Sequence, residues 1–443
     1  MKRRVLVAIA LAASVGLTGC SGGLSIDDLN PFSQREQILP GERQEILAEP
    51  NPLAVDPALA GVQAIVLPPA INNSDWSQPG GNPANAPGHL AYSGSGQRIW
   101  MSSAGRGTGR YGNISASPVI AGGRAFVMDV EGKVTALAAS GGGRAWQVSI
   151  VPEGDDDDGI TGGGLAADGG TLFVATGYGE IIAFDQGTGQ RRWTTKMDIP
   201  LRSAPTVANG ILFVVGTDNR VFAVSTADGS QLWSFRGIPE TTGLVSSASP
   251  AVSGDIVVVP FSSGEIIAFQ AATGQPVWAE SLTRTRSFTS LSGIREVAAR
   301  PVIQDGVVYA ISVSGRMIAT GLANGDRVWT KNFAGVHTPA IAGESLFAVD
   351  IRGKLAAMSR ASGQVLWLVD MPKNEDEETW AGPVVAGGKL WLASSEGRLV
   401  SVDPASGQMI SEHDIGDPVR LQPIVALNTM YVFTDDANLV AFN

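Results

Sequence analysis

The sequence predicts an all-β fold, an eight-bladed β-propeller built from four-stranded antiparallel blades. Three observations predict it: a short segment recurs at a nearly constant period, turn residues stand at fixed places in each unit, and the two ends of the repeat region complement one another. Gly and Pro number 55 and 25 among 443 residues, too many for a helical bundle. No 3.6-residue apolar period persists, so we expect strands rather than helices.

The recurring segment has the form Gly-Glu-Ile-Ile-Ala-Phe and occurs eight times, with starting points 38 to 51 residues apart. A period near 40 residues is typical of solenoids and propellers. A Gly follows ten residues after each of the first seven starting points, and a Trp follows four residues later in six of them; the seventh has Ser411 there. The eight segments begin at Gly132, Gly179, Asn219, Gly264, Gly315, Gly353, Gly397 and Ala437.

Each unit is predicted to contain four short strands, because runs of Val, Ile, Phe and Trp alternate with Gly, Asp and Asn. Those polar residues and Gly adopt the positive φ angles that hairpin turns need. Seven of the ten Trp share one repeat position, which favours packing between blades over a carbohydrate-binding surface. Trp76, Trp380 and Trp391 lie off the pattern, and Trp380 either packs or faces a partner.

The two ends of the repeat region favour a closed ring over an open array. The last unit stops after three strands at Asn443, while residues 96–100 resemble an isolated fourth strand with the same Gly-to-Trp spacing. Placing the Trp100 strand on the C-terminal blade removes two exposed sheet edges. Seven full units and one shared unit give eight blades.

The N-terminus has the features of an exported lipoprotein. A basic start precedes a short apolar run, which is too short for a transmembrane helix and is typical of a signal peptide over residues 1–19. Residues 17–20 resemble a bacterial lipobox, so Cys20 is the expected lipidation site; an ordinary secretory signal is the alternative. Residues 20–75 are predicted to be a Pro-rich tether, although residues 58–75 are equally compatible with packing on the domain, and residues 76–443 form the propeller.

Composition excludes several functions. The chain has one Cys, three scattered His and a net charge of −11, which argue against a disulfide framework, a Cys-based zinc site and nucleic-acid binding. No Walker, HExxH or EF-hand motif occurs. We expect no catalytic residues, no metal site and no cofactor.

The repeat resembles that of the pyrroloquinoline quinone (PQQ) enzymes, whose blades carry the Ala-x-Asp-x-x-Thr-Gly-x-x-x-Trp pattern seen at residues 183–193. That resemblance raises a quinoprotein dehydrogenase as an alternative function. It implies a quinone stacked on a vicinal disulfide with Ca²⁺ beside it. A second Cys is missing, so the enzyme reading is disfavoured.

Lipobox, tether and propeller together resemble the BamB family, the propeller lipoproteins of the outer-membrane β-barrel assembly (BAM) machinery. The resemblance implies a non-catalytic scaffold that binds the periplasmic POTRA domains of a BamA-like subunit and assists the folding of outer-membrane proteins. It also implies lipid anchoring at the periplasmic face of the outer membrane, for which Ser21 after the Cys is suited. A polysaccharide-binding surface lipoprotein remains a third alternative.

One segment resembles the partner-binding loop of that family. Asp198–Pro205 has Ile199, Leu201 and Arg202 where the family has Leu-x-Leu-Arg before a Ser-Ala-Pro strand start. An exposed apolar pair beside an Arg suits an interface hot spot; the alternative is a turn with both side chains tucked between blades. Glu296, in the connection from Arg284 to Arg300, keeps one carboxylate of a second family contact, and the basic residues of that connection are candidates for pairing with an acidic partner.

Overall fold

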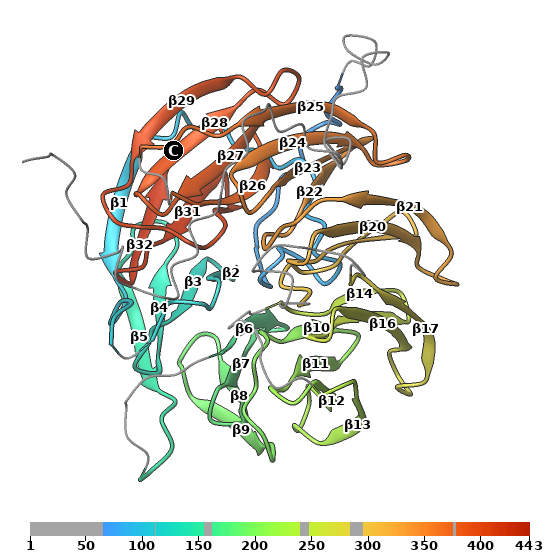
Figure 1. Ribbon diagram of the computed structural model, residues 1–443. Coiled ribbons are helices and arrows are strands. Elements are labelled where there is room, and N and C mark those ends of the chain that lie inside the picture. The colour runs from blue at the N-terminus through green and yellow to red at the C-terminus, as the bar shows by residue number, and fades with distance from the viewer. Residues whose placement is uncertain (1–64, 111, 155–161, 240–247, 284–295, 375–377) are drawn as a thin grey trace, which may run out of the picture. The chain divides into compact units, whose positions relative to one another are not determined.

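The computed structural model describes residues 65–110, 112–154, 162–239, 248–283, 296–374 and 378–443. Within these ranges, 32 strands form eight four-stranded antiparallel sheets and no helix is present. The sheets stand around a ring as blades (Figure 1). The predicted all-β class and the eight-bladed propeller are therefore confirmed.

The blades follow chain order, and each runs from an inner first strand to an outer fourth strand. We number them from blade 1 (β2–β5) to blade 8 (β30, β31, β32 and β1). The first strands are β2 Val119–Ala121, β6 Gly163–Asp168, β10 Thr206–Ala208, β14 Ala251–Ser253, β18 Val302–Gln304, β22 Ala340–Ala342, β26 Trp380–Ala386 and β30 Ile424–Ala426. The second strands are β3 Arg124–Met128, β7 Thr171–Thr176, β11 Ile211–Val215, β15 Ile256–Pro260, β19 Val307–Ile311, β23 Ser345–Val349, β27 Lys389–Ser394 and β31 Thr429–Phe433.

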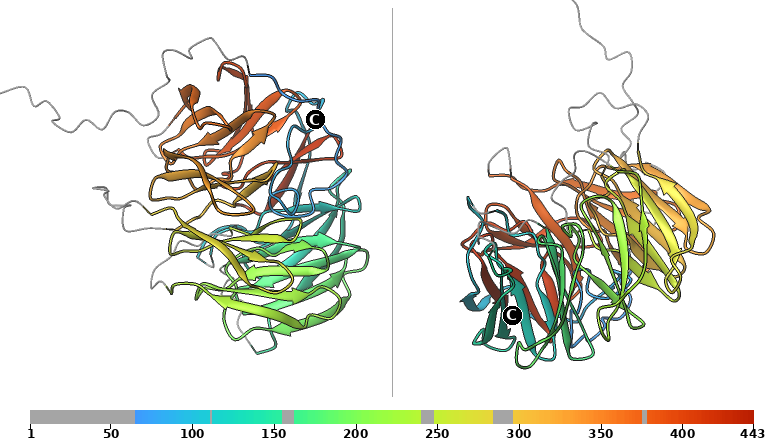
Figure 2. Two further views of the ribbon diagram at one scale, coloured as in Figure 1. Left: turned by 90° about the vertical axis from the view of Figure 1, so that its right-hand side faces the viewer. Right: turned by 90° about the horizontal axis from the view of Figure 1, so that it is seen from below.

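Burial separates the two sides of each blade. The third strands are β4 Lys133–Ala138, β8 Glu180–Asp185, β12 Arg220–Ser225, β16 Glu265–Gln270, β20 Arg316–Gly321, β24 Lys354–Ser359, β28 Arg398–Val402 and β32 Asn438–Phe442. The fourth strands are β5 Arg144–Ser149, β9 Arg191–Lys196, β13 Gln231–Arg236, β17 Pro276–Ser281, β21 Arg327–Asn332, β25 Val365–Asp370, β29 Met409–Asp414 and β1 Arg98–Ser103. The first three strands are mostly buried, whereas in most blades the fourth alternates between exposed and more buried residues. Figure 2 shows the blades from two further sides.

A row of three residues crosses most blades. In blade 2, Ala183 of β8 pairs with Phe173 on one side and Trp193 on the other. Because Ala is small, the two aromatic rings meet over it, with centroids 5.9 Å apart. In blade 7, Trp391 takes the second-strand position and Ser411 the fourth. The off-pattern Trp391 thus lies in the same three-residue row as Ser411, which stands where the other repeats have Trp.

The repeated Trp and Gly join neighbouring blades. The indole Nε1 of Trp233 donates a hydrogen bond to the carbonyl oxygen of Ala271 in the next blade, at 2.8 Å. Gly274 lies on the face of the same indole, where a methyl group would come within 2.5 Å of the ring. The same two contacts link Trp146, Trp193, Trp278, Trp329 and Trp367 to the blades that follow them. The inter-blade role predicted for the repeated Trp is confirmed.

The ring closes as the sequence predicts. Strand β1 pairs antiparallel with β32, so the N-terminal strand completes blade 8, and Trp100 stands opposite Ala441. Trp100 also lies against Gly142 of blade 1, which continues the inter-blade contact across the junction of the two chain ends. The described part of the chain therefore has no blade that ends the series.

Residues 65–92, which we call the plug segment, lie along the first strands at the centre of the ring (blue in Figure 1). Within the described residues, its hydrogen bonds reach seven of the eight blades. Backbone bonds join Trp76 to Ile120, Ser77 to Ala167, Pro83 to Val252, Ala84 to Ile303, Leu90 to Val385 and Asn73 to Leu427, and the Gln78 side chain bonds Val207.

The plug segment begins inside the stretch that the sequence assigns to the tether. Ile71 forms a parallel bridge with Leu90, and the amide of Asn73 donates to the carbonyl of Val425 at 2.7 Å. Residues 65–75 therefore lie against the propeller, in agreement with the alternative that part of the tether packs on the domain.

Replacing one of the inter-blade indoles tests the packing of the ring. We expect Trp329→Ala to lower the free energy of unfolding by about 3–5 kcal/mol, because it empties a buried site and leaves the Arg360 carbonyl without its 2.8 Å donor. Chemical denaturation followed by tryptophan fluorescence measures the change.

Val328→Ala is the matched control, because Val328 precedes Trp329 on β21 but is 52% exposed. It should change stability by no more than about 0.5 kcal/mol. Equal effects of the two substitutions would contradict the proposed role of the indole.

Candidate functional site

The predicted partner-binding segment joins β9 to β10, at the end of the ring where the blade-to-blade connections lie. Ile199 is half-buried and packs in the space above Gly216. Leu201 is fully buried in the core between blades 2 and 3, since its backbone N–H bonds the Thr176 carbonyl and draws it inward. Arg202 is 8% exposed. The sequence predicted an exposed apolar pair, Ile199 and Leu201, beside an exposed Arg. The predicted exposure is wrong for Leu201 and Arg202, and Leu201 instead follows the alternative of a side chain tucked between blades.

Arg202 reaches a second predicted residue, Glu296, although 94 positions separate them in the chain. Arg202 Nη1 donates to Glu296 Oε1 at 2.9 Å, and Nη2 donates to the Pro260 carbonyl at 3.1 Å. The two side chains are 9% and 1% exposed. The pair thus ties the connection before blade 3 to β15 and to the connection before blade 5.

Arg202 and Glu296 are buried away from water, so each charge is compensated by the other. Burial lowers the pKa of Arg202, and the attraction of the Glu296 carboxylate works against that fall. Removing one partner of such a pair leaves an uncompensated buried charge. The Arg202–Glu296 pair therefore holds the backbone of both connections in place.

The solvent-facing part of the segment is polar around Ile199. The Asp198 side chain is 66% exposed and pairs with Arg220 at 2.9 Å, and Arg220 also contacts Asp218. Pro200 is exposed. Asp198, Ile199 and Pro200 form the accessible surface of this connection, whereas Leu201 and Arg202 lie below it.

Only part of the second predicted contact, the connection from Arg284 to Arg300, lies in the described residues. Residues 284–295, with Arg284, Arg286 and Arg295, lie outside the described part of the chain. Glu296 is buried, and Arg300 is 9% exposed and points inward rather than toward a partner. Of this connection, the described residues contribute support rather than contact surface.

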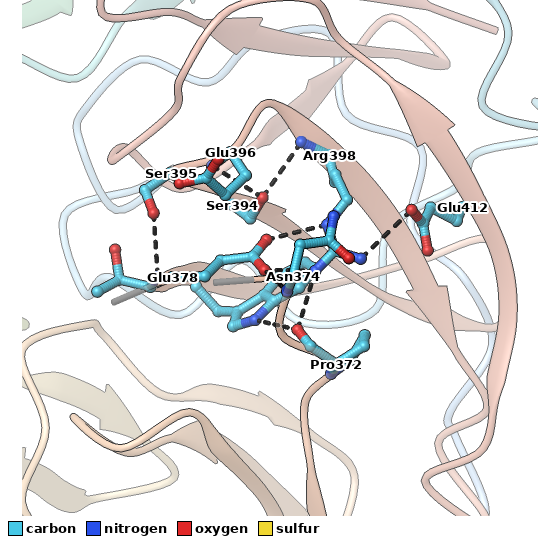
Figure 3. Close-up of polar contacts among 10 residues, drawn as sticks. Pro372, Asn374, Glu378, Ser394, Ser395, Glu396, Arg398 and Glu412 are labelled. Carbon is cyan, nitrogen blue, oxygen red and sulfur yellow. Dashed lines mark hydrogen bonds and ion pairs between the residues drawn. The ribbon is translucent and has the colours of Figure 1, made fainter. Parts of the chain in front are cut away.

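Blade 7 contains another buried ion pair (Figure 3). Arg398 Nε donates to Glu378 Oε1 at 2.9 Å, and Arg398 Nη2 donates to the Pro372 carbonyl at 2.9 Å. Its guanidinium lies 5.0 Å from the centroid of the Trp380 ring. Burial opposes the charged form of Glu378, but the Arg398 hydrogen bond lowers its pKa below the ordinary value. Trp380 is 2% exposed, so of its two predicted roles packing is the one observed.

The predicted lipoprotein features lie outside the described part of the chain. Cys20, the signal peptide and residues 20–64 of the tether lie outside the described residues. The described segments include no group of three or more His, Cys, Asp or Glu side chains able to hold a metal ion. They include no helix long and apolar enough to cross a membrane.

Residues 130–369 and 352–443 match the family model of the outer membrane protein assembly factor BamB. The chain belongs to the BamB family. The matched region contains the blades from β4 onward together with the Asp198–Pro205 segment and Glu296.

The relatives are distant. BamB of Nitrosomonas eutropha is 25% identical over 215 residues, which are 48% of this chain and 51% of that protein. BamB of Yersinia pestis is 25% identical over 244 residues, 54% of this chain and 62% of that one. The chain thus spans about half to three fifths of the length of these relatives.

Solved structures agree on the fold. BamB from Moraxella catarrhalis superposes with a TM-score of 0.66 at 19% identity, covering 78% of this chain and 99% of that one. Quinohemoprotein alcohol dehydrogenase from Comamonas testosteroni gives a TM-score of 0.68 at 14% identity, covering 84% and 81%. The propeller is therefore shared by assembly factors and quinoproteins, and the fold alone does not separate them.

The residues present do not fit the quinone and Ca²⁺ cradle that the second resemblance implies. Cys20 is the only Cys, so a vicinal disulfide is impossible. Within the described ranges, carboxylates do not gather with other ligand types in a metal-binding group. We derive no reaction step from such a cofactor.

Sequence reasoning found Arg202 and Glu296 separately but missed that they form a pair. It also missed the plug segment, since residues 65–92 carry no strand period.

The wild type, Arg202→Ala, Glu296→Ala and the double variant form a double-mutant cycle. We expect each single change to cost about 3–5 kcal/mol of stability.

The double variant should lose clearly less than the sum of the two single losses, because it leaves no unpaired charge. Denaturation of the four proteins under one set of conditions measures the coupling. Additive losses would show that the buried ion pair does not act as a unit.

Proposed function

We propose that this protein is a non-catalytic scaffold of the outer-membrane β-barrel assembly machinery. The match of residues 130–443 to the BamB family model carries the proposal. The residues add to it, because the chain has neither a cysteine pair nor, in the described ranges, a metal-binding cluster that would support quinoprotein chemistry. In this proposal the protein acts by binding a partner through a rigid ring, without catalysis.

The proposed partner is a BamA-like subunit, bound through its POTRA domains. Asp198, Ile199 and Pro200 supply the contact surface, with Ile199 as the apolar anchor in a polar surround. Leu201, Arg202 and Glu296 act as positioning residues in this proposal: Leu201 fixes the connection to the core, and the ion pair fixes it to blades 4 and 5.

The N-terminal sequence supports a proposal for where the protein is located. We propose that residues 1–19 are removed, that Cys20 carries the lipid, and that the protein is anchored at the periplasmic face of the outer membrane. The stretch from residue 20 to the start of the plug segment would separate the propeller from the membrane. Nascent outer-membrane proteins are further proposed clients, because the fourth strands present outer sheet edges that an extended chain can pair with.

The polysaccharide-binding alternative requires exposed aromatic side chains. All ten Trp lie in the described residues, and none of them is exposed. This observation disfavours a stacking surface for sugars.

Affinity purification from native membranes in mild detergent tests the proposal. Tagged wild-type protein should recover a POTRA-bearing barrel subunit, identified by mass spectrometry. Ile199→Glu should reduce that recovery at least tenfold, because it places a charge at the apolar anchor without removing the Arg202–Glu296 pair.

Leu232→Glu is the matched control, because Leu232 lies on the outer wall of blade 3 and is 49% exposed. Its recovery should equal that of wild type. Equal recovery with Ile199→Glu would show that the site is wrong, and absence of the subunit from the wild-type sample would contradict the assembly function.

A further inference from the structure

A cavity of about 520 Å³ opens at the centre of the ring, on the same end as the blade-to-blade connections. Its walls come from the residues just before the first strands of blades 1, 4, 5, 6 and 8. The described lining residues used below are Ile114, Ser117, Arg300, Val336, His337, Thr338 and Leu421. A volume of this size is within the range that holds a small organic ligand.

The plug segment closes the inner end of this cavity. It bonds the middle residues of first strands, for example Val252 and Ile303, whereas the residues that line the cavity precede those strands. A small space of about 10 Å³ lies between the plug segment and the first strands, and Thr338 borders both spaces. We call the 520 Å³ cavity the central cup.

Arg300 enters this cup as a buried cation. Its Nη2 donates to Ser117 Oγ at 2.8 Å, which links blade 5 to blade 1 on the opposite side of the ring. Its Nη1 lies 3.4 Å from Thr338 Oγ1, and Nε has no acceptor. Burial lowers the pKa of Arg300 to about 10, so it keeps its charge at neutral pH.

The other two buried arginines differ from it in one respect. Arg202 is paired with Glu296, and Arg398 is paired with Glu378. Among the described residues, no carboxylate lies within ion-pair distance of Arg300, and its hydrogen-bond partners there are neutral hydroxyls. A buried cation with no anion is unfavourable for the free protein, and a bound anion would remove that cost.

The remaining wall is suited to an anion with an apolar body. None of the described lining residues is Asp or Glu, although the chain carries 42 of them. Burial and the nearby Arg300 lower the pKa of His337 to about 4, so its ring is neutral at pH 7. Ile114, Val336 and Leu421 supply apolar surface, which inorganic phosphate would leave unfilled.

We propose that the central cup binds a small organic carboxylate, whose carboxylate group pairs with Arg300 and whose hydrocarbon part lies against Ile114, Val336 and Leu421. The planar guanidinium offers a carboxylate two parallel donors. This site is independent of the Ile199 surface and does not rest on the proposed assembly function.

Thermal unfolding and isothermal titration calorimetry of the purified chain test the site. The probes are benzoate and succinate, with benzamide and succinamide as neutral isosteres and inorganic phosphate as a separate arm. One of the two acids should bind at concentrations of about 1 mM or less and raise the unfolding temperature, while its amide should not.

Arg300→Gln should abolish that binding and, because it removes an unpaired buried charge, should raise the unfolding temperature of the ligand-free protein. Arg144→Gln, at an exposed Arg on β5, should change neither. Leu421→Trp, which keeps Arg300 and fills the cup, should also abolish binding, so the test survives if Arg300→Gln does not fold.

Three results would overturn the proposal. Binding of neither acid would remove the site, and equal binding of acid and amide would remove the role of the charge. Binding of phosphate as tight as that of the acids would replace the organic carboxylate with a general oxyanion.

Discussion

The contact between the Trp of one blade and the Gly of the next sets the geometry on which the rest of the structure depends. An indole lies flat against a residue without a side chain, and its N–H bonds a carbonyl three residues before that Gly, as in Trp233 with Gly274 and Ala271. Any larger residue at the Gly would separate the blades. The contact recurs at every junction between blades except that of blades 7 and 8, where Ser411 stands, and the apolar cores lie between blades rather than within them.

The centre of the ring is organised by different forces. On one side, the plug segment forms hydrogen bonds with backbone groups of the first strands. On the side of the blade-to-blade connections, buried arginines hold those connections in place. Arg202 is paired with Glu296, whereas no carboxylate of the described residues pairs with Arg300. The Arg202–Glu296 pair stabilises a surface loop. Arg300, in our proposal, keeps its charge available to a ligand. One end of the ring thus combines a proposed protein contact around Ile199 with a proposed ligand cup at the axis.

The sequence was sufficient for the architecture because the architecture is periodic. Gly142 and its six equivalents, the Trp four residues later and the unpaired Trp100 strand together predicted eight blades and the place of closure. Features without a period could not be predicted. The sequence showed Ser411 as a departure but not that Trp391 lies two strands away in the same row. Leu201 and Arg202 were expected on the surface because a connection is usually exposed; the pair between Arg202 and Glu296, distant in sequence, required the three-dimensional structure, as did the contacts of the plug segment.

The central functional claim is that the Asp198–Pro200 surface faces a POTRA-bearing subunit in the membrane. Site-specific photocrosslinking in living cells tests it most directly, with a photoreactive amino acid at Pro200 and, as a reference, at Leu232 on the outer wall of the same blade. We predict a crosslinked adduct with that subunit from position 200 and none from position 232. An adduct from 232 but not from 200, or from neither position in cells that contain the subunit, would contradict the claim.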